Sequence, residues 1–199
     1  MKHVKIILIM LMSFNFLVSF QTDKLIPESQ TIKTAYDNLL KNPDNKEIQK
    51  QYINDFPDNT DVFKKVFHSS TFDQLYMVSH LYILKLAELS KNFPVLVGDK
   101  LIKLCIGLKE WDADAIGYIQ HVTMGYANSN YSDFTQLIKK LNNYDLDTLA
   151  TFLADVENHS AYGDYQKFMY KLKTNNETEL FDLFKKTKDI RISQKDHNF

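Results

Sequence analysis

The chain has 199 residues, 44% of them hydrophobic and 25% charged, and this composition suits one globular domain with a sizeable core. Its formal net charge is −1 and Arg191 is its only arginine, so it lacks the electrostatic footprint of a nucleic-acid-binding protein and we expect no nucleic-acid partner. Only five glycines and four prolines are present, too few for the many tight turns of a β-sandwich or barrel.

The beginning of the chain has the pattern of an export signal. Lys2 and Lys5 make a basic start, and an apolar stretch of about 15 residues follows at 6–20. That length is typical of a signal peptide and short for a membrane span, which needs about 20 residues. We therefore predict a signal peptide at 1–21, cleaved within 19–22, with an uncleaved N-terminal anchor as the alternative. The mature chain is expected in the periplasm or the cell exterior, without a membrane span.

Apolar residues at helical spacing predict helices in the first half of the mature chain, at 28–41, about 45–55 and 60–68, the last with Thr60 as its N-cap. The longest helix is predicted at 71–91. It is apolar nearly all round, because Met77, Val78, Leu81 and Leu84 widen its hydrophobic stripe. Such a helix is expected in the middle of a bundle.

The second half continues the pattern. A helix at 95–108 is expected to end near Gly107, and Gly163 and Asp164 precede another helix. N-caps of further helices are predicted at Asp112, Ser132, Asp145 and Asn176.

These helices are joined by short connections, which imply antiparallel neighbours. The predicted fold is all-α, with stacked helical hairpins that form either a compact bundle or a short right-handed solenoid-like array. We expect a single helical domain at 22–189 and a flexible polar tail at 190–199.

One constellation could support catalysis. Asp112, Asp114 and His121 lie on or near one predicted helix, and a carboxylate or histidine from elsewhere, such as His80, could complete an acid–base or metal set. Aspartates at a helix start are equally expected as caps. Two turns, about 10 Å of rise, separate Asp114 from His121, too far for direct contact. No histidine pair has metal-ligand spacing, so we expect no metal and no cofactor.

Tyrosines cluster in the second half of the chain. Tyr118, Tyr126, Tyr131 and Tyr162 are the candidate binding residues, because tyrosine is common at protein interfaces. Tyrosine is also an ordinary helix-packing residue, and that interpretation stays open. Cys105, the sole cysteine, lies in an apolar helical stretch and is expected to be a buried, unreactive thiol.

Two stretches carry a resemblance to known proteins: 56–67 (FPDNTDVFKKVF), and 101–106 (LIKLCI) followed by 111–116 (WDADAI). Together with the leader, they resemble a group of exported, all-helical bacterial proteins with no assigned activity. The resemblance implies a helical protein on the envelope side and carries over no catalytic residues.

The leading hypothesis is an exported, non-enzymatic protein-binding domain. One concrete version is an immunity-type protein that occludes a toxin. Loss of Lys2 and Lys5 with the leader leaves 22 basic residues against 25 acidic ones, a slight negative charge that suits a basic partner. The alternatives are a metal-assisted hydrolase whose site is assembled from several helices, and an envelope adaptor that forms homo-oligomers.

Overall fold

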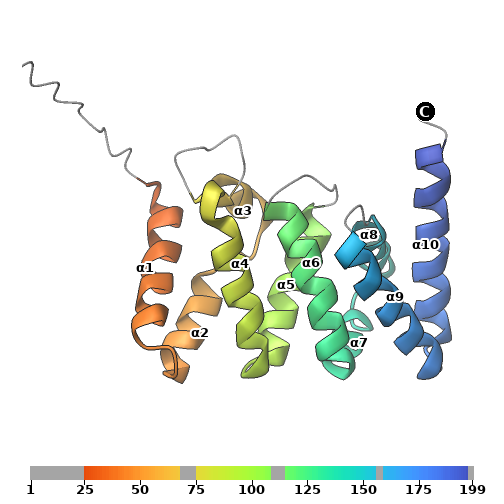
Figure 1. Cartoon of the computed structure of the whole chain (residues 1–199), viewed down its shortest axis with the longest axis horizontal. Helices are drawn as coiled ribbons and strands as arrows, with labels where there is room; N and C mark the ends of the chain where they lie inside the picture. Colours follow the sequence, from red (N-terminus) through yellow and green to blue (C-terminus); the bar gives the residue numbers. More distant parts are fainter. Residues whose placement is uncertain (1–24, 68–74, 109–114, 156–158, 197–199) are drawn as a thin grey trace, which may run out of the picture.

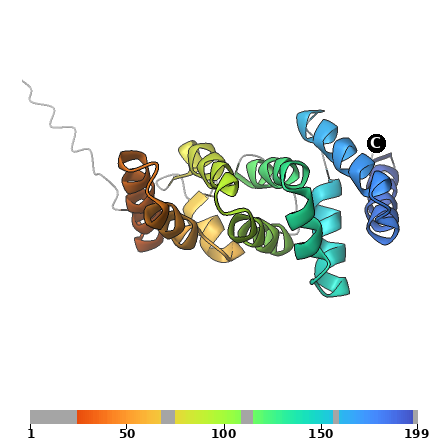
Figure 2. The same ribbon diagram turned by 90° about the horizontal axis from the view of Figure 1, so that it is seen from below.

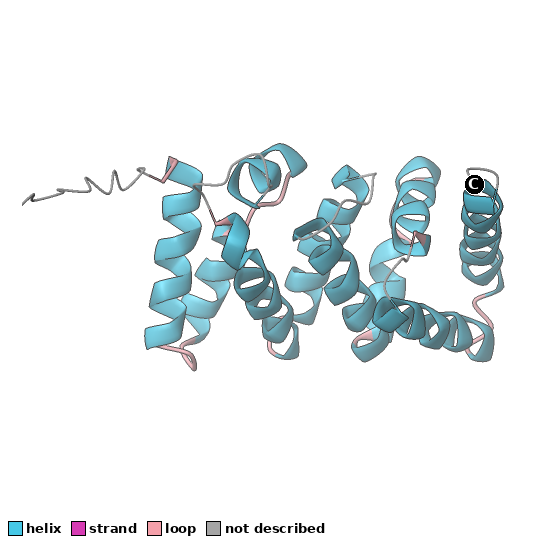
Figure 3. Cartoon of the chain, turned by 45° about the horizontal axis from the view of Figure 1, so that its top comes forward, coloured by secondary structure: helices cyan, strands magenta, loops and turns pink. Residues whose placement is uncertain are grey.

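The computed structural model describes residues 25–67, 75–108, 115–155 and 159–196, and throughout these parts the chain is helical, without a strand (Figure 3). Two short 3-10 helices, η1 and η2, flank α4. The elements are α1 (Pro27–Lys41), α2 (Lys46–Asp55), α3 (Thr60–Phe67), η1 (Tyr76–Val78), α4 (Ser79–Glu88), η2 (Leu89–Lys91), α5 (Pro94–Leu108), α6 (Ala115–Ser129), α7 (Tyr131–Ile138), α8 (Asn143–Ala154), α9 (His159–Thr174) and α10 (Thr178–Asp196).

The helices form two layers that run along the length of the molecule (Figures 1 and 2). One layer consists of α1, α4, α6 and α9, and the other of α2, α5, α8 and α10, while the short helices α3 and α7 lie between successive hairpins. Within a layer, α4 packs on α6 and α6 on α9, and α5 packs on α8 and α8 on α10. The all-α prediction is confirmed, and the hairpins form an extended array rather than a compact bundle. The right-handed turn of the array stays a prediction.

A continuous core lies between the two layers. The largest side chains in this core are aromatic. Their rings contact each other in tilted, stacked or edge-on arrangements. Ring centroids lie 5.2 to 6.5 Å apart in two sets, Phe56–Phe63–Phe67 and Phe134–Phe168–Phe184. Because each hairpin buries its apolar stripe against the next, the core extends through the whole array.

Several helix ends differ from the predicted ones because a nearby asparagine caps better in the local geometry. Asn59, not Thr60, caps α3, since its side-chain oxygen accepts from the Val62 amide at 2.9 Å. Asn142 caps α8 by accepting from the amide of Asp145 at 2.9 Å, so Asp145 lies in the first turn. Short polar side chains at this position satisfy amides that have no partner within the helix.

Other predicted boundaries also differ from the observed ones. Ser132 lies inside α7, and Gly163 and Asp164 lie inside α9. Asn176 ends α9 instead of beginning α10. Its φ of 58° is left-handed, its amide donates to the carbonyl of Lys173, and the next amide donates to the carbonyl of Leu172. This is the Schellman geometry, which asparagine tolerates better than most residues.

Gly107 does not terminate α5 but lies within it. A Cβ added there would overlap the Thr60 hydroxyl, so glycine allows the start of α3 to approach α5 closely. Of the helix predicted at 71–91, residues 71–74 lie outside the described parts, and the remainder contains η1, α4 and η2. At the other end, α10 continues to Asp196 and so passes through most of the predicted tail.

Buried polar side chains hold helix ends together between hairpins. Lys100 of α5 donates to the carbonyl of Phe56, at 2.7 Å, where α2 ends. Gln120 of α6 donates to the carbonyls of Phe152 and Asp155, at 2.6 and 2.8 Å, where α8 ends. Both side chains satisfy carbonyls that have no partner within their own helix. Burial lowers the pKa of Lys100, an effect partly offset by Asp58.

Candidate functional site

Two of the four candidate binding tyrosines are packing residues. Tyr126 is only 3% exposed, and its hydroxyl donates to the carbonyl of Pro94 at 2.8 Å. The ring lies so close to Gly98 that any Cβ there would overlap it, and burial raises the Tyr126 pKa. Tyr131 is half-buried, with its ring 6.3 Å from Phe168. Tyr126 therefore packs between helices instead of lying on a surface, and Tyr131 mainly packs against α9.

The same use of tyrosine recurs along the array. The hydroxyl of Tyr52 donates to the carbonyl of Tyr82 at 2.7 Å, and that of Tyr165 to the carbonyl of Phe184 at 2.8 Å. A tyrosine can fill the space between two helices with its ring and satisfy a carbonyl with its hydroxyl. Much of the tyrosine content therefore joins helices and does not mark an interface.

Tyr118 and Tyr162, in contrast, are exposed. Tyr162 on α9 lies under the ammonium group of Lys188, 5.5 Å from the ring centroid, and so contacts α10. Tyr118 on α6 lies beside His80 on α4, with ring centroids 5.7 Å apart. Through this ring contact Tyr118 lies next to α4, which carries, with η1 before it, other exposed apolar side chains.

Those side chains belong to η1 and α4. Met77 is 74% exposed, Leu81 43% and Leu84 39%, and Val78 is similarly accessible. Leu81 and Leu84 are three residues apart on α4, so their side chains share one face, and Met77 and Val78 belong to η1, which leads directly into α4. We call these four residues together with Tyr118 the α4–α6 strip.

The strip is mostly apolar, and the charged side chains nearest to it on α4 neutralise each other. Its nearest charged neighbours on α4, Lys85 and Glu88, form an ion pair at 2.5 Å. Isolated apolar side chains on a surface are ordinary, but a contiguous set with a polar margin is typical of an interaction site. What the strip can do chemically is bury apolar area against another surface, with His80 and the Tyr118 hydroxyl as polar contacts.

Sequence reasoning recognised these apolar residues and placed them wrongly. A helix that is apolar on all sides was expected in the middle of the bundle. Instead, α4 lies in one of the two layers, and its buried residues are only Ser79, Tyr82, Ile83 and Leu86. This helix has more apolar residues than one neighbouring layer can cover. That surplus was the sequence signal that could have identified the strip.

The catalytic candidates do not assemble into a site in the described parts of the chain. Asp112 and Asp114 fall outside those parts. His80 and His121 are half-buried on neighbouring helices, and Nδ1 of His121 meets no hydrogen-bond partner among the described residues. Within the same residues, no cluster of three histidine, cysteine or acidic side chains could hold a metal ion.

Cys105 is fully buried, with its sulfur 3.3 Å from the Thr123 hydroxyl. Burial raises its pKa to about 12, so the thiolate that a nucleophile requires does not form at neutral pH. The predicted unreactive thiol agrees with this setting.

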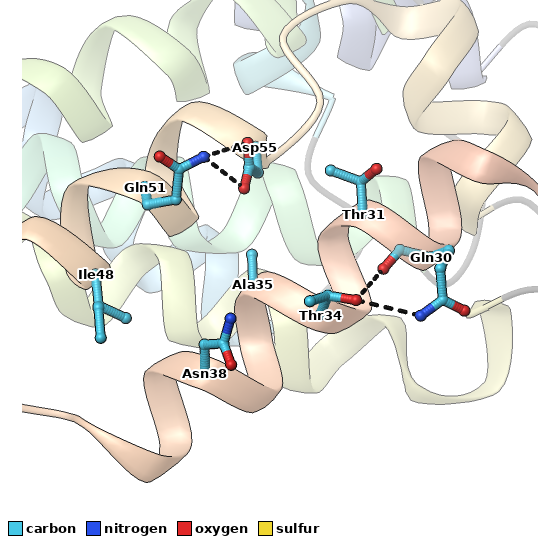
Figure 4. A pocket seen from close by; sticks show the side chains of 8 residues that line it. All are labelled: Gln30, Thr31, Thr34, Ala35, Asn38, Ile48, Gln51 and Asp55. Atoms are coloured by element: carbon cyan, nitrogen blue, oxygen red, sulfur yellow. Dashed lines mark hydrogen bonds between the residues drawn. The ribbon is translucent and has the colours of Figure 1, made fainter.

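A groove of about 440 Å³ lies between α1 and α2 at one end of the array, and most of the residues that line it are of polar types (Figure 4). Its polar groups are largely engaged with their own helices: Gln51 donates to Asp55 at 2.8 Å, and Thr34 to the carbonyl of Gln30 at 2.8 Å. A polar outer face is what the terminal unit of a helical array needs for solubility. We therefore assign this groove to the end face of the fold.

Comparison of the chain with protein-family models, with curated proteins and with solved structures finds no match in any of the three. In the described parts, none of the helices combines the length and the apolar character that crossing a bilayer requires.

Proposed function

We propose that this protein is an exported, non-enzymatic binding module that recognises a protein partner through the α4–α6 strip. The observation that carries the proposal is the exposed apolar face of α4, contiguous with Tyr118 through the ring contact with His80. Export rests on the leader pattern of the sequence, and occlusion of a toxin remains one concrete form of such binding.

The arrangement supports this function in two ways. An array of stacked hairpins presents a broad surface built on rigid elements, and repeat-like helical proteins commonly use such surfaces for binding. The strip also combines aliphatic and aromatic side chains, the types that contribute most when water is excluded at the centre of an interface.

The spacing of the strip favours one kind of partner surface. Leu81 and Leu84, at i and i+3 on α4, together with Met77 of η1 just before them, extend over about two turns, a length over which amphipathic helices can pack. We therefore expect the partner to present a helix with an apolar face of about two turns.

The experiment is affinity capture with the tagged mature chain and an envelope extract of its own organism. The double variant Met77→Gln and Leu81→Gln removes apolar area and keeps side-chain size and helix propensity. Val95→Gln is the matched control, because Val95 is an exposed apolar residue on α5 outside the strip.

The proposal requires one stoichiometric protein that wild type and Val95→Gln retain and the double variant loses. Equal recovery by all three proteins would contradict it. If the retained protein is a second copy of the chain and light scattering shows an oligomer that the double variant dissolves, the partner is the protein itself and the adaptor hypothesis holds.

A further inference from the structure

A second groove lies between α8 and α10, with a volume of about 480 Å³. Its lining combines two basic side chains, Lys186 and Arg191, with Thr151 and with the apolar Leu183 and Ile190. In contrast to the groove between α1 and α2, it brings positive charge and an apolar wall together.

The guanidinium group of Arg191 forms only a weak polar contact with the rest of the described chain. Its Nη2 lies 3.7 Å from a carboxylate oxygen of Asp155, farther than a normal N–H···O hydrogen bond. Its Nε is buried and meets no acceptor among the described residues. A guanidinium carries five N–H donors in a fixed plane. The buried Nε does not face solvent, so the terminal Nη groups, with Asp155 as a distant partner, are the donors that a ligand can contact.

The composition of the chain makes this position distinctive. The chain has 24 basic residues, and every one except Arg191 is lysine. A long ion pair with a single contact, such as that between Arg191 and Asp155, can be formed by lysine equally well, whereas arginine is favoured where a planar, two-oxygen acceptor must be held.

We propose that the groove between α8 and α10 binds an aliphatic carboxylate, with its two oxygens on Arg191 and its alkyl group against Leu183 and Ile190. A carboxylate fits better than a phosphate dianion because Asp155 lies near the guanidinium and Asp147 lines the same groove. Asp147 precedes Asp155 by about two helical turns on α8, so it lies away from the carboxylate end and disfavours a second acidic group there. This site is independent of the α4–α6 strip.

Two sources share this chemistry: the C-terminal residue of an apolar peptide and a short branched fatty acid. The probes are N-acetylleucine for the peptide end and 4-methylpentanoate for the fatty acid. N-acetylleucinamide, which lacks the carboxylate, is the matched control ligand. Each is titrated at millimolar concentration into the isotope-labelled mature protein, and amide chemical shifts are followed by NMR.

We expect saturable shifts at Thr151, Ile190 and Arg191 with both acids and none with the amide. Tighter binding of N-acetylleucine identifies a peptide end as the source, and tighter binding of 4-methylpentanoate identifies a fatty acid. Arg191→Lys keeps the charge and loses the planar fork, so it should weaken binding about fivefold or more.

Lys173→Gln is the control for charge, because it removes one positive charge from an exposed position on α9. Thr151→Val is a second test that leaves the ion pair between Arg191 and Asp155 in place, and it should weaken binding to a smaller extent. The inference is overturned if neither acid binds saturably, if the amide binds as well as the acids, or if Arg191→Lys and Lys173→Gln weaken binding equally.

Discussion

Two regions of this molecule reverse the usual distribution of polar and apolar side chains. At the contacts between hairpins, Lys100, Gln120 and Tyr126 are buried, whereas Met77 and Leu81 of the α4–α6 strip are exposed. Each buried polar group has a backbone carbonyl as its partner, so the fold accounts for it. For the exposed apolar residues, no contact within the described chain explains their position. The difference separates side chains that hold the array together from side chains that are free to bind.

The largest effect is expected at Gln120. Gln120→Ala leaves the carbonyls of Phe152 and Asp155 without their donor and opens a cavity, so the free energy of unfolding should fall by about 2–4 kcal/mol. Urea unfolding followed by circular dichroism measures it. Gln136→Ala, at an exposed position on α7, is the control and should change stability by less than about 0.5 kcal/mol. Similar losses in both variants would contradict the capping role.

Lys100→Met should have a smaller effect. The substitution keeps the buried stem and removes the donor to the carbonyl of Phe56, but it also removes the cost of burying a charge. We therefore expect the free energy of unfolding to fall by only about 1–2 kcal/mol in the same urea experiment. A gain in stability would mean that the ammonium group is retained for a reason other than holding the end of α2.

The buried tyrosines predict a specific response to alkaline pH. Burial raises the pKa of Tyr126 and Tyr165 and raises that of Tyr82 to about 12, while an unfolded tyrosine has a pKa near 10. Because these folded-state values are raised, their contribution to stability is complete below pH 10. For Tyr82 it is lost between pH 10 and about 12.

Urea midpoints measured across that range should therefore fall steeply above pH 10. Tyr126→Phe cannot ionise, so its decline should be shallower than that of the wild type. At neutral pH the same variant should lose about 1 kcal/mol, the usual value of one hydrogen bond. The exposed Tyr170→Phe is the control and should follow the wild-type pH profile. A Tyr126→Phe profile that coincides with wild type above pH 10 would contradict the assignment.

The smallest effect on stability is expected in the strip, where the comparison is sharpest. Met77→Gln with Leu81→Gln should change the free energy of unfolding by less than about 0.5 kcal/mol per residue, because neither side chain is buried. Thermal unfolding by calorimetry measures this, and partner capture by the same sample measures binding. A loss of several kcal/mol would show that the strip belongs to the core.

The helical class of this protein could be predicted from sequence because it depends on local information. Apolar residues at helical spacing and the small number of glycines and prolines predicted α1, α2, α3 and α5 close to their observed bounds. Asn59 and Asn142 show the limit of prediction from sequence. A neighbouring residue, Thr60 or Asp145, was an equally suitable cap, and only the local backbone geometry decided which side chain caps the helix.

Tertiary structure alone decided which apolar and aromatic residues are buried. Tyr118 and Tyr126 lie two turns apart on α6 and look alike in the sequence, yet one is exposed and the other is a core residue bonded to Pro94. Periodicity shows that a face is apolar but not whether another helix covers it. Coverage depends on contacts between distant segments, and for this reason the sequence by itself determined the helices, while the packing of the hairpins decided which surface remained available for binding.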